Sequence, residues 1–101
     1  IGSDIPNSIL IDSMNSKVEM EDHGIRVIRT KAPAGSGSPM HSHGAGVAVL
    51  LTDQKAMLTS INGDVSEVNL KAGTVHWREE VTHSGKNMND AALEVILFEL
   101  M

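Results

Sequence analysis

The sequence predicts a small all-β domain, folded as a sandwich or a barrel. Short runs rich in Val, Ile and Thr recur about every ten residues, and Gly, Pro, Asn and Asp separate them. Trp77 and Phe98 are the only aromatic residues, so Val, Ile, Leu and the six Met residues must form the core. Nine strands are expected, at residues 8–12, 17–20, 25–31, 46–52, 56–60, 65–70, 74–78, 82–87 and 93–100.

Turn residues between these runs indicate where the chain reverses. Asn62-Gly63 lies between two runs, and this pair readily adopts the positive φ angles of a tight hairpin. Asp53-Gln54 predicts a second hairpin, and residues 71–73 and 87–90 mark two further reversals. These positions divide the chain into antiparallel segments of similar length.

Two segments are compatible with more than one structure. Residues 32–39, APAGSGSP, have the composition of a linker, but they lead directly into His41, so we expect a surface loop that borders a site. Residues 90–101 fit either a helix capped by Asp90 or a final strand. We favour the strand, because β-branched and aromatic residues follow and every other element is extended.

Length, charge and composition restrict the function. The 101 residues are expected to form one domain, spanning residues 1–101, with residues 1–7 flexible or left over from a tag. The formal net charge is −5 and there is no basic stripe, so nucleic acid is not expected as a partner. The sequence contains no cysteine, so a metal ion would have to bind His, Asp or Glu.

The sequence also predicts where the protein resides and how it assembles. No apolar stretch approaches the roughly 20 residues that cross a bilayer, and the start at Ile1 has neither the basic nor the apolar region of a signal peptide. We therefore expect a soluble, cytoplasmic protein with no membrane partner. A chain this small has a thin core and exposed edge strands, so we also expect a homodimer.

Histidine forms the one group of residues with recognisable chemistry. His41 and His43 are two residues apart, so on a strand their side chains project to the same face, with Cα atoms about 6.5 Å apart. His83, from another strand, would complete a set of three ligands and leave coordination positions for water, substrate or dioxygen. The spacing alone marks a polar loop rim more often than a metal site.

Two longer stretches around these histidines resemble the cupin family. Residues 35–43, GSGSPMHSH, look like the first cupin motif, in which a Gly-containing loop precedes His-x-His on a barrel strand. Residues 73–87, GTVHWREEVTHSGKN, look like the second motif, with a Gly that opens a strand and then His83 followed by Asn87. Residues 44–72 have the length of the region between the motifs, and the two motifs with this region cover about half of the chain.

The resemblance implies a fold, a site and an assembly. The fold is a small antiparallel β-barrel of the double-stranded β-helix, or jelly-roll, type, and it is usually dimeric. A divalent transition metal is held inside one open end, with His41 and His43 as the ligands of the first motif and His83 as the ligand of the second. The ion could be Fe, Zn, Ni or Mn, because imidazole suits each of them.

The sequence departs from the family pattern in two places. The family's Glu ligand would fall at Val47 or Ala48, so it is missing here. The Pro-x-Gly turn before the third histidine is replaced by Glu79-Glu80-Val81. The missing Glu changes the charge of the site, and the altered turn changes the approach to His83.

Without that Glu, three neutral imidazoles leave the double positive charge of an ion uncompensated, so the site should attract anions. By strand alternation Val47 and Val49 share a face with His43, which predicts an apolar wall beside the metal. A small chelating anion, such as an enolate, a diketonate or a carboxylate, fits both features. The site thus resembles the three-histidine branch of the cupins, which includes iron-dependent oxygenases that cleave carbon–carbon bonds.

Other residues near the two motifs are open to more than one role. His76 either lines the pocket or faces outward. Trp77 either packs in the barrel or stacks on a substrate, and packing is the commoner role of a lone large aromatic side chain. Arg78, Glu79 and Glu80 form a charged turn that is expected on a solvated edge, with Glu79 or Glu80 as a base or a fourth ligand as the alternative. Asn87 is expected to bind backbone groups at the end of its strand.

Two functions follow from these observations. The first is a metal-dependent oxygenase that acts on a small anionic chelator, such as a diketone or a carboxylate, with the metal as a Lewis acid or an electron-transfer centre. The second is a non-catalytic module that holds a small metabolite in the same cavity. Oxygen uptake distinguishes the two, because only the enzyme would turn its ligand over.

Overall fold

The computed structural model describes residues 6–7 and 14–101, and the regular elements in these ranges are all β-strands. They are β1 (Ser16–Asp22), β2 (Ile25–Ala32), β3 (Gly37–His43), β4 (Gly46–Leu50), β5 (Gln54–Ser60), β6 (Val65–Leu70), β7 (Val75–Arg78), β8 (Val81–Asn87) and β9 (Leu93–Leu100). The all-β prediction is confirmed, and the segment near the C-terminus is a strand rather than a helix. The strand expected at residues 8–12 lies outside the described residues. Within them, no helix is long and apolar enough to span a bilayer.

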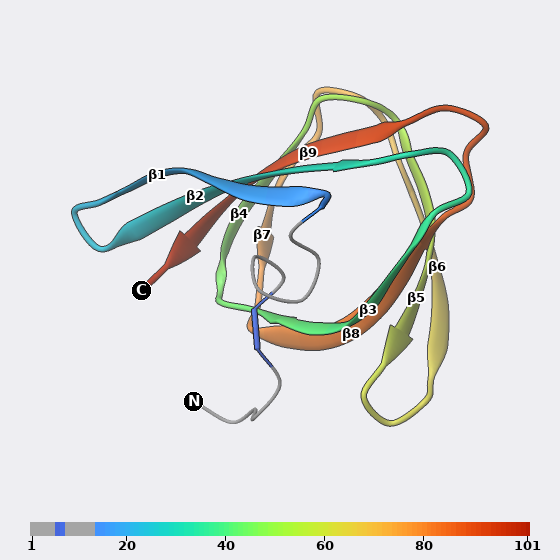
Figure 1. Cartoon of the computed structure of the whole chain (residues 1–101), viewed down its shortest axis with the longest axis horizontal. Coiled ribbons are helices and arrows are strands. Elements are labelled where there is room, and N and C mark those ends of the chain that lie inside the picture. Colours follow the sequence, from blue (N-terminus) through green and yellow to red (C-terminus); the bar gives the residue numbers. More distant parts are fainter. Residues whose placement is uncertain (1–5, 8–13) are drawn as a thin grey trace.

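The strands form two antiparallel sheets. One has the order β1-β2-β9-β4-β7, and the other has the order β3-β8-β5-β6. In Figure 1, β3 and β8 run together below the strands of the first sheet, and the β5–β6 hairpin extends to one side. In the described part of the chain, backbone ladders join strands within each sheet and not between the sheets. The predicted antiparallel barrel therefore takes the form of two sheets that enclose a cavity between them.

β5 and β6 form the hairpin that Asn62-Gly63 predicts. The two strands pair in register from Gln54 and Leu70 to Thr59 and Val65. Gly63 has a φ angle of 88°, and its N–H donates a hydrogen bond to the Ser60 carbonyl. The connection spans residues 61–64 with only the glycine at positive φ, so the hairpin is real but wider than a two-residue turn.

The reversal at Asp53-Gln54 is not a hairpin, contrary to the prediction. β4 pairs with β7 and β9, whereas β5 pairs with β6 and β8, so the chain crosses from one sheet to the other here. Asp53 stabilises the crossing by accepting a hydrogen bond from the Ala72 N–H at 2.8 Å. A turn signal marks a reversal, but long-range packing decides which sheet the next strand joins.

The loop expected at residues 32–39 is also shorter than predicted. β3 begins at Gly37, because Gly37 and Ser38 already pair with Lys86 and Gly85 of β8. Only residues 33–36 connect β2 to β3. The Gly, Ser and Pro content suggested a loop, but the pairing with β8 makes the second half of the segment a strand.

Asn87, at the end of β8, holds this short connection in place. Its side chain is 3% exposed, and its amide donates hydrogen bonds to the carbonyls of Ala32 and Pro33 at 3.1 and 3.3 Å. A third hydrogen bond goes to the Ala91 carbonyl at 3.0 Å. The expectation that Asn87 binds backbone groups at a strand end is confirmed.

The hydrophobic core lies against the inner face of the five-stranded sheet. Ile28, Ala48 and Leu97 form its central cluster, and they come from the neighbouring strands β2, β4 and β9. Leu50 is 1% exposed and follows Ala48 on the same face of β4. Burial of each large aliphatic side chain contributes about 1.5–3 kcal/mol, so this cluster fixes the sheet that carries β9.

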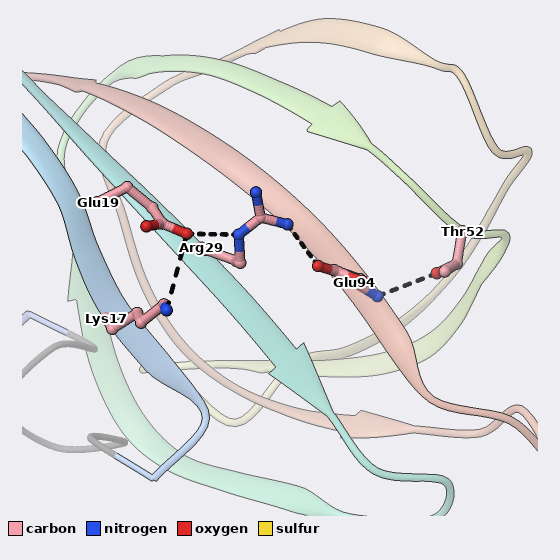
Figure 2. Close-up of polar contacts among 5 residues, drawn as sticks. All are labelled: Lys17, Glu19, Arg29, Thr52 and Glu94. Carbon is pink, nitrogen blue, oxygen red and sulfur yellow. Dashed lines mark hydrogen bonds and ion pairs between the residues drawn. The ribbon is translucent and has the colours of Figure 1, made fainter.

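Ion pairs join three strands on the outer face of the same sheet. Arg29 of β2 binds Glu19 of β1 and Glu94 of β9, and Glu19 also lies 4.0 Å from Lys17 (Figure 2). The hydroxyl of Thr52 accepts a hydrogen bond from the Glu94 N–H at 3.0 Å. Because these side chains are substantially exposed to water, they fix local geometry more than they add to global stability.

Gly46 is the point of closest approach between β4 and β9, and replacing it tests this packing. A Cβ atom at residue 46 would lie 1.8 Å from the Phe98 carbonyl oxygen, so one of the strands would have to move. We expect Gly46→Ala to lower the free energy of unfolding, measured in urea, by about 1–3 kcal/mol. Gly37→Ala is the control, because its Cβ would lie 3.4 Å from the nearest atom, the Gly85 carbonyl oxygen. Equal losses in the two variants would contradict this account.

Candidate metal centre

The pairing of β3 with β8 brings three histidines together. His41 lies directly opposite His83 in the antiparallel register, and His43 follows two residues later on the same face of β3. The ring centroid of His41 is 4.7 Å from that of His43 and 5.0 Å from that of His83, and the remaining pair is separated by 5.3 Å. The nitrogen atoms that could bind a metal lie within 4.8 Å of one another. The three residues that the sequence grouped into one site are therefore neighbours.

An irregularity in β3 sets the direction of the His41 ring. The register shifts between Ser38 and His41, where Pro39 lacks the N–H needed for a ladder hydrogen bond. The Pro39 carbonyl accepts a hydrogen bond from Nδ1 of His41 at 2.7 Å. Because a carbonyl can only accept, Nδ1 carries the proton, and the lone pair of the neutral ring is on Nε2.

Glu99 of β9 fixes the ring of His43 in the same manner. Both side chains are buried, and Oε2 of Glu99 lies 2.9 Å from Nδ1 of His43. The other carboxylate oxygen accepts a hydrogen bond from the Asn7 side-chain amide at 2.8 Å. The lone pair of His43 is then also on Nε2, which is the arrangement found in metal sites where a carboxylate orients a histidine ligand.

The Glu99 carboxylate remains ionised in this buried position. Burial alone would raise its pKa, but the hydrogen bonds from His43, Asn7 and the Gly44 backbone together hold the pKa below its usual value. A negative charge therefore sits behind one of the three imidazoles. The sequence analysis missed this residue, although a signal was present: Leu93, Val95 and Leu97 mark the inward face of the final strand, and Glu99 is the next residue on it.

Pro6 and Asn7, the residues that the structure describes before residue 14, also belong to this region. Asn7 forms an isolated bridge with Ser42, and the Pro6 carbonyl accepts a hydrogen bond from the Ser42 N–H at 2.9 Å. Of residues 1–7, which are expected to be flexible or left over from a tag, the structure describes residues 6–7, and these lie along β3. Asn7 thereby supplies one of the hydrogen bonds that hold Glu99.

Burial keeps the imidazoles of His43 and His83 neutral. Desolvation, together with the neighbouring His43, His41 and Arg78 side chains, lowers the pKa of His83 to about 3. Desolvation also lowers the pKa of His43, against the opposing effect of Glu99. Neutral imidazoles are the form that binds metal ions, and an all-nitrogen set suits Fe, Zn, Ni or Mn better than Mg or Ca. The donor set present in the chain therefore fits a divalent transition metal.

A cavity of about 190 Å³ lies between the sheets and is lined by the three histidines. Apolar side chains from both sheets form most of its wall, including Ala48, Leu50 and Leu58. His76, on β7, also lines it, which places this residue at the pocket rather than on the outer face. The cavity is small and mostly apolar.

Val47 and Val49 do not line the cavity, which corrects the prediction of an apolar wall built from these two residues. The prediction carried the alternation of β3 through to residue 49. β3 ends at His43, however, and β4 begins at Gly46 in the other sheet, so the alternation restarts. Ala48 forms the apolar wall instead, and Val47 and Val49 lie on the opposite face of β4.

Trp77, Glu79 and Glu80 also lie outside the cavity. Trp77 is 52% exposed, so it neither fills the interior nor stacks on a ligand in the cavity. Its indole N–H donates a hydrogen bond to the Glu79 carboxylate. Glu79 and Glu80 are exposed, in keeping with the solvated edge that the sequence predicts. Arg78 departs from that prediction, because it lines the cavity. The carboxylate that contacts the histidines is Glu99, from a different strand.

Comparison with known proteins supports the fold. Neither a protein-family model nor a curated protein matches the sequence. Among solved structures, a cupin domain from Bordetella pertussis Tohama I is 22% identical, with 99% of each chain covered and a TM-score of 0.77. The chain has the cupin fold. At this level of identity the likeness concerns the fold alone.

Other cupin structures are similar over most of the chain. A cupin superfamily protein from Desulfitobacterium hafniense DCB-2 is 12% identical, with 85% of this chain and 75% of that chain covered and a TM-score of 0.62. A cupin-2 domain protein from Shewanella frigidimarina NCIMB 400 is 15% identical, with 85% and 79% covered and a TM-score of 0.56. The resemblance of the two histidine motifs to the cupin family therefore agrees with the fold.

The lowered pKa of His83 predicts how the metal-free protein responds to acid. Below about pH 6.5 the unfolded chain takes up a proton at His83, whereas the folded chain does so only near pH 3. The free energy of unfolding should therefore fall as the pH drops through this window, and Glu99 acts in the same direction because its folded pKa is lowered. Urea denaturation in the presence of EDTA measures the slope. His83→Gln, which removes one titrating group, should flatten it, and an unchanged slope would contradict the assignment.

Proposed function

We propose that this cupin-fold protein is metal-dependent, with His41, His43 and His83 as the ligands of one divalent transition-metal ion. The observation that carries the proposal is the orientation of the rings. Hydrogen bonds to Pro39 and Glu99 occupy Nδ1 of two rings, so their Nε2 atoms present lone pairs beside the third imidazole. Three ligands leave coordination positions available, as a catalytic site requires.

We propose further that the centre acts on a small anionic chelator, such as a carboxylate or a diketone, as an oxygenase. A bound ion would supply a Lewis-acid or electron-transfer centre. The residues of the chain would do the rest: the cavity of about 190 Å³ admits only small molecules, and its aliphatic wall excludes water. The hydrogen bonds to Pro39 and Glu99 would keep two ligand rings in fixed orientations.

Replacing His83 tests the ligand set. We expect His83→Ala to lose at least about tenfold in metal affinity, because two ligands bind a divalent ion much more weakly than three. The measurement is elemental analysis of protein purified without a nickel column and then titrated with Fe(II) or Zn(II). His76→Ala is the matched control, because His76 lines the same cavity but is outside the group of three. Equal metal occupancy in folded His83→Ala and wild type would overturn the assignment.

Oxygen uptake by the iron-loaded protein then tests the reaction. The wild type should consume dioxygen with at least one member of a panel of small diketones and 2-oxo acids, and His83→Ala should not. Tight binding of a panel member without oxygen uptake would contradict the oxygenase and indicate a metabolite-binding module. The metal-free wild type serves as the blank for non-enzymatic oxidation.

We also propose that two copies associate through the outer face of the five-stranded sheet. Both aromatic residues lie there, Trp77 on β7 and Phe98 on β9. Each is paired in the ladder with Val47, on the β4 strand between them. They are 52% and 38% exposed, which is unusual for the largest apolar side chains of a monomer. The Glu79 carboxylate beside Trp77 accepts a hydrogen bond from its indole N–H, and the charges farther along the face, on Arg29 and Glu94, are paired with each other within one copy.

Replacing Trp77 tests this assembly. The wild type should sediment as a dimer at micromolar concentration, and Trp77→Glu should sediment as a monomer, because each copy would bury a carboxylate at the symmetric interface. Ile61→Glu is the control, since Ile61 is 57% exposed in the turn of the β5–β6 hairpin, on the other sheet. A monomeric wild type, or a dimeric Trp77→Glu, would rule out this interface.

A further inference from the structure

Arg78 is a cation inside the cavity that the metal ligands do not explain. It is the last residue of β7, and its side chain lines the cavity together with His41, His43 and His83. In the part of the chain that the structure describes, no carboxylate oxygen lies within 4.0 Å of its guanidinium group. The guanidinium is held in a largely apolar space without a close counter-ion among these residues.

Gly46 and Glu99 determine what surrounds this guanidinium. Arg78 lies opposite Gly46 in the β4–β7 ladder, and Gly46 lies opposite Glu99 in the β4–β9 ladder. Because residue 46 has no side chain, Arg78 and Glu99 influence each other electrostatically across it. The oxygens of Glu99, however, already accept hydrogen bonds from His43 and Asn7. Glu99 therefore attracts Arg78 from a distance but does not pair with it.

A buried guanidinium is costly unless an anion meets it. Arginine stays protonated under physiological conditions, so it does not escape the cost by losing its proton. Its planar group of donors matches the two oxygens of a carboxylate, with two parallel hydrogen bonds. The imidazoles of His43 and His83 are neutral, so the positive charge at this end of the cavity wall is that of Arg78, while the ionised Glu99 lies behind His43 and outside the lining. These properties are those of a guanidinium group that binds the carboxylate of a ligand.

We propose that Arg78 is the anion-binding residue of this cavity, where its guanidinium pairs with the carboxylate of a small ligand such as a 2-oxo or 2-hydroxy acid. The inference rests on the proposed function, because the 2-oxo or 2-hydroxy oxygen of such a ligand would face the metal bound by the three histidines. It narrows the ligand class from chelating anions in general to carboxylates. A neutral diketone of the same size offers no charge to the guanidinium.

Pyruvate and 2,3-butanedione form a matched pair of probes, because they differ only in a carboxylate in place of an acetyl group. Protein loaded with Zn(II), which does not undergo redox turnover, is titrated with each by calorimetry. We expect the wild type to bind pyruvate more tightly than butanedione. Arg78→Gln should lose about tenfold or more in pyruvate affinity while it keeps its zinc, because hydrogen bonds to charged groups contribute about 1.5–3 kcal/mol.

Lys31→Gln is the matched control, because Lys31 is an exposed cation on the same sheet and does not line the cavity. It should bind pyruvate as the wild type does. If Arg78→Gln does not fold, Arg78→Lys replaces it, with a smaller loss expected because an ammonium group does not form the paired hydrogen bonds. Pyruvate affinity equal to the wild type in a folded Arg78 variant, or tighter binding of butanedione than of pyruvate, would overturn the proposal.

The two proposals fail in different ways. A wild type that takes up no zinc contradicts the metal centre, and the pyruvate titration is then made on the metal-free protein. In that case, a tenfold loss of pyruvate affinity in Arg78→Gln supports the anion site, and an unchanged pyruvate affinity contradicts it. If the wild type binds zinc and zinc-loaded Arg78→Gln binds pyruvate as tightly as the wild type, the metal centre is supported and the anion site is contradicted.

Discussion

The candidate site depends on the register of β3 against β8. Residue 41 faces residue 83 across the ladder, and residue 43 lies on the same side of the strand. Because side chains alternate between the faces of a strand, a slip of one residue would turn His41 and His43 to the outside. The outer face of the same pair carries a hydrogen bond between the hydroxyls of Ser42 and Thr82 at 2.9 Å, which supports the observed register.

The five-stranded sheet contributes the charges of the site, and the four-stranded sheet contributes the imidazoles. Glu99 and Arg78 are on β9 and β7, on either side of Gly46 on β4. One of these charges is fixed by hydrogen bonds to a histidine and an asparagine, and the other faces the cavity. A site built from both groups therefore requires the two sheets to be held together.

Much of the fold and part of the site could be predicted from the sequence. Local patterns identified eight of the nine observed strands, and the Asn62-Gly63 hairpin followed from the preferences of the two residues. The histidine motifs grouped His41, His43 and His83 because their spacing resembles a known arrangement. Glu99 and Arg78 have no such motif. Their positions follow from strand pairings between segments far apart in the chain, which a single sequence does not encode locally.

The errors have the same origin. The hairpin expected at Asp53-Gln54 and the wall expected from Val47 and Val49 both assumed that neighbouring strands in the chain stay in one sheet. In this fold most connections cross between the sheets, and each crossing resets the alternation of inward and outward residues. The most direct test of the central claim is anomalous X-ray diffraction at the metal absorption edges from crystals grown without added metal. The account predicts one strong peak in bonding contact with the imidazoles of residues 41, 43 and 83, and a peak bonded to other residues would contradict it.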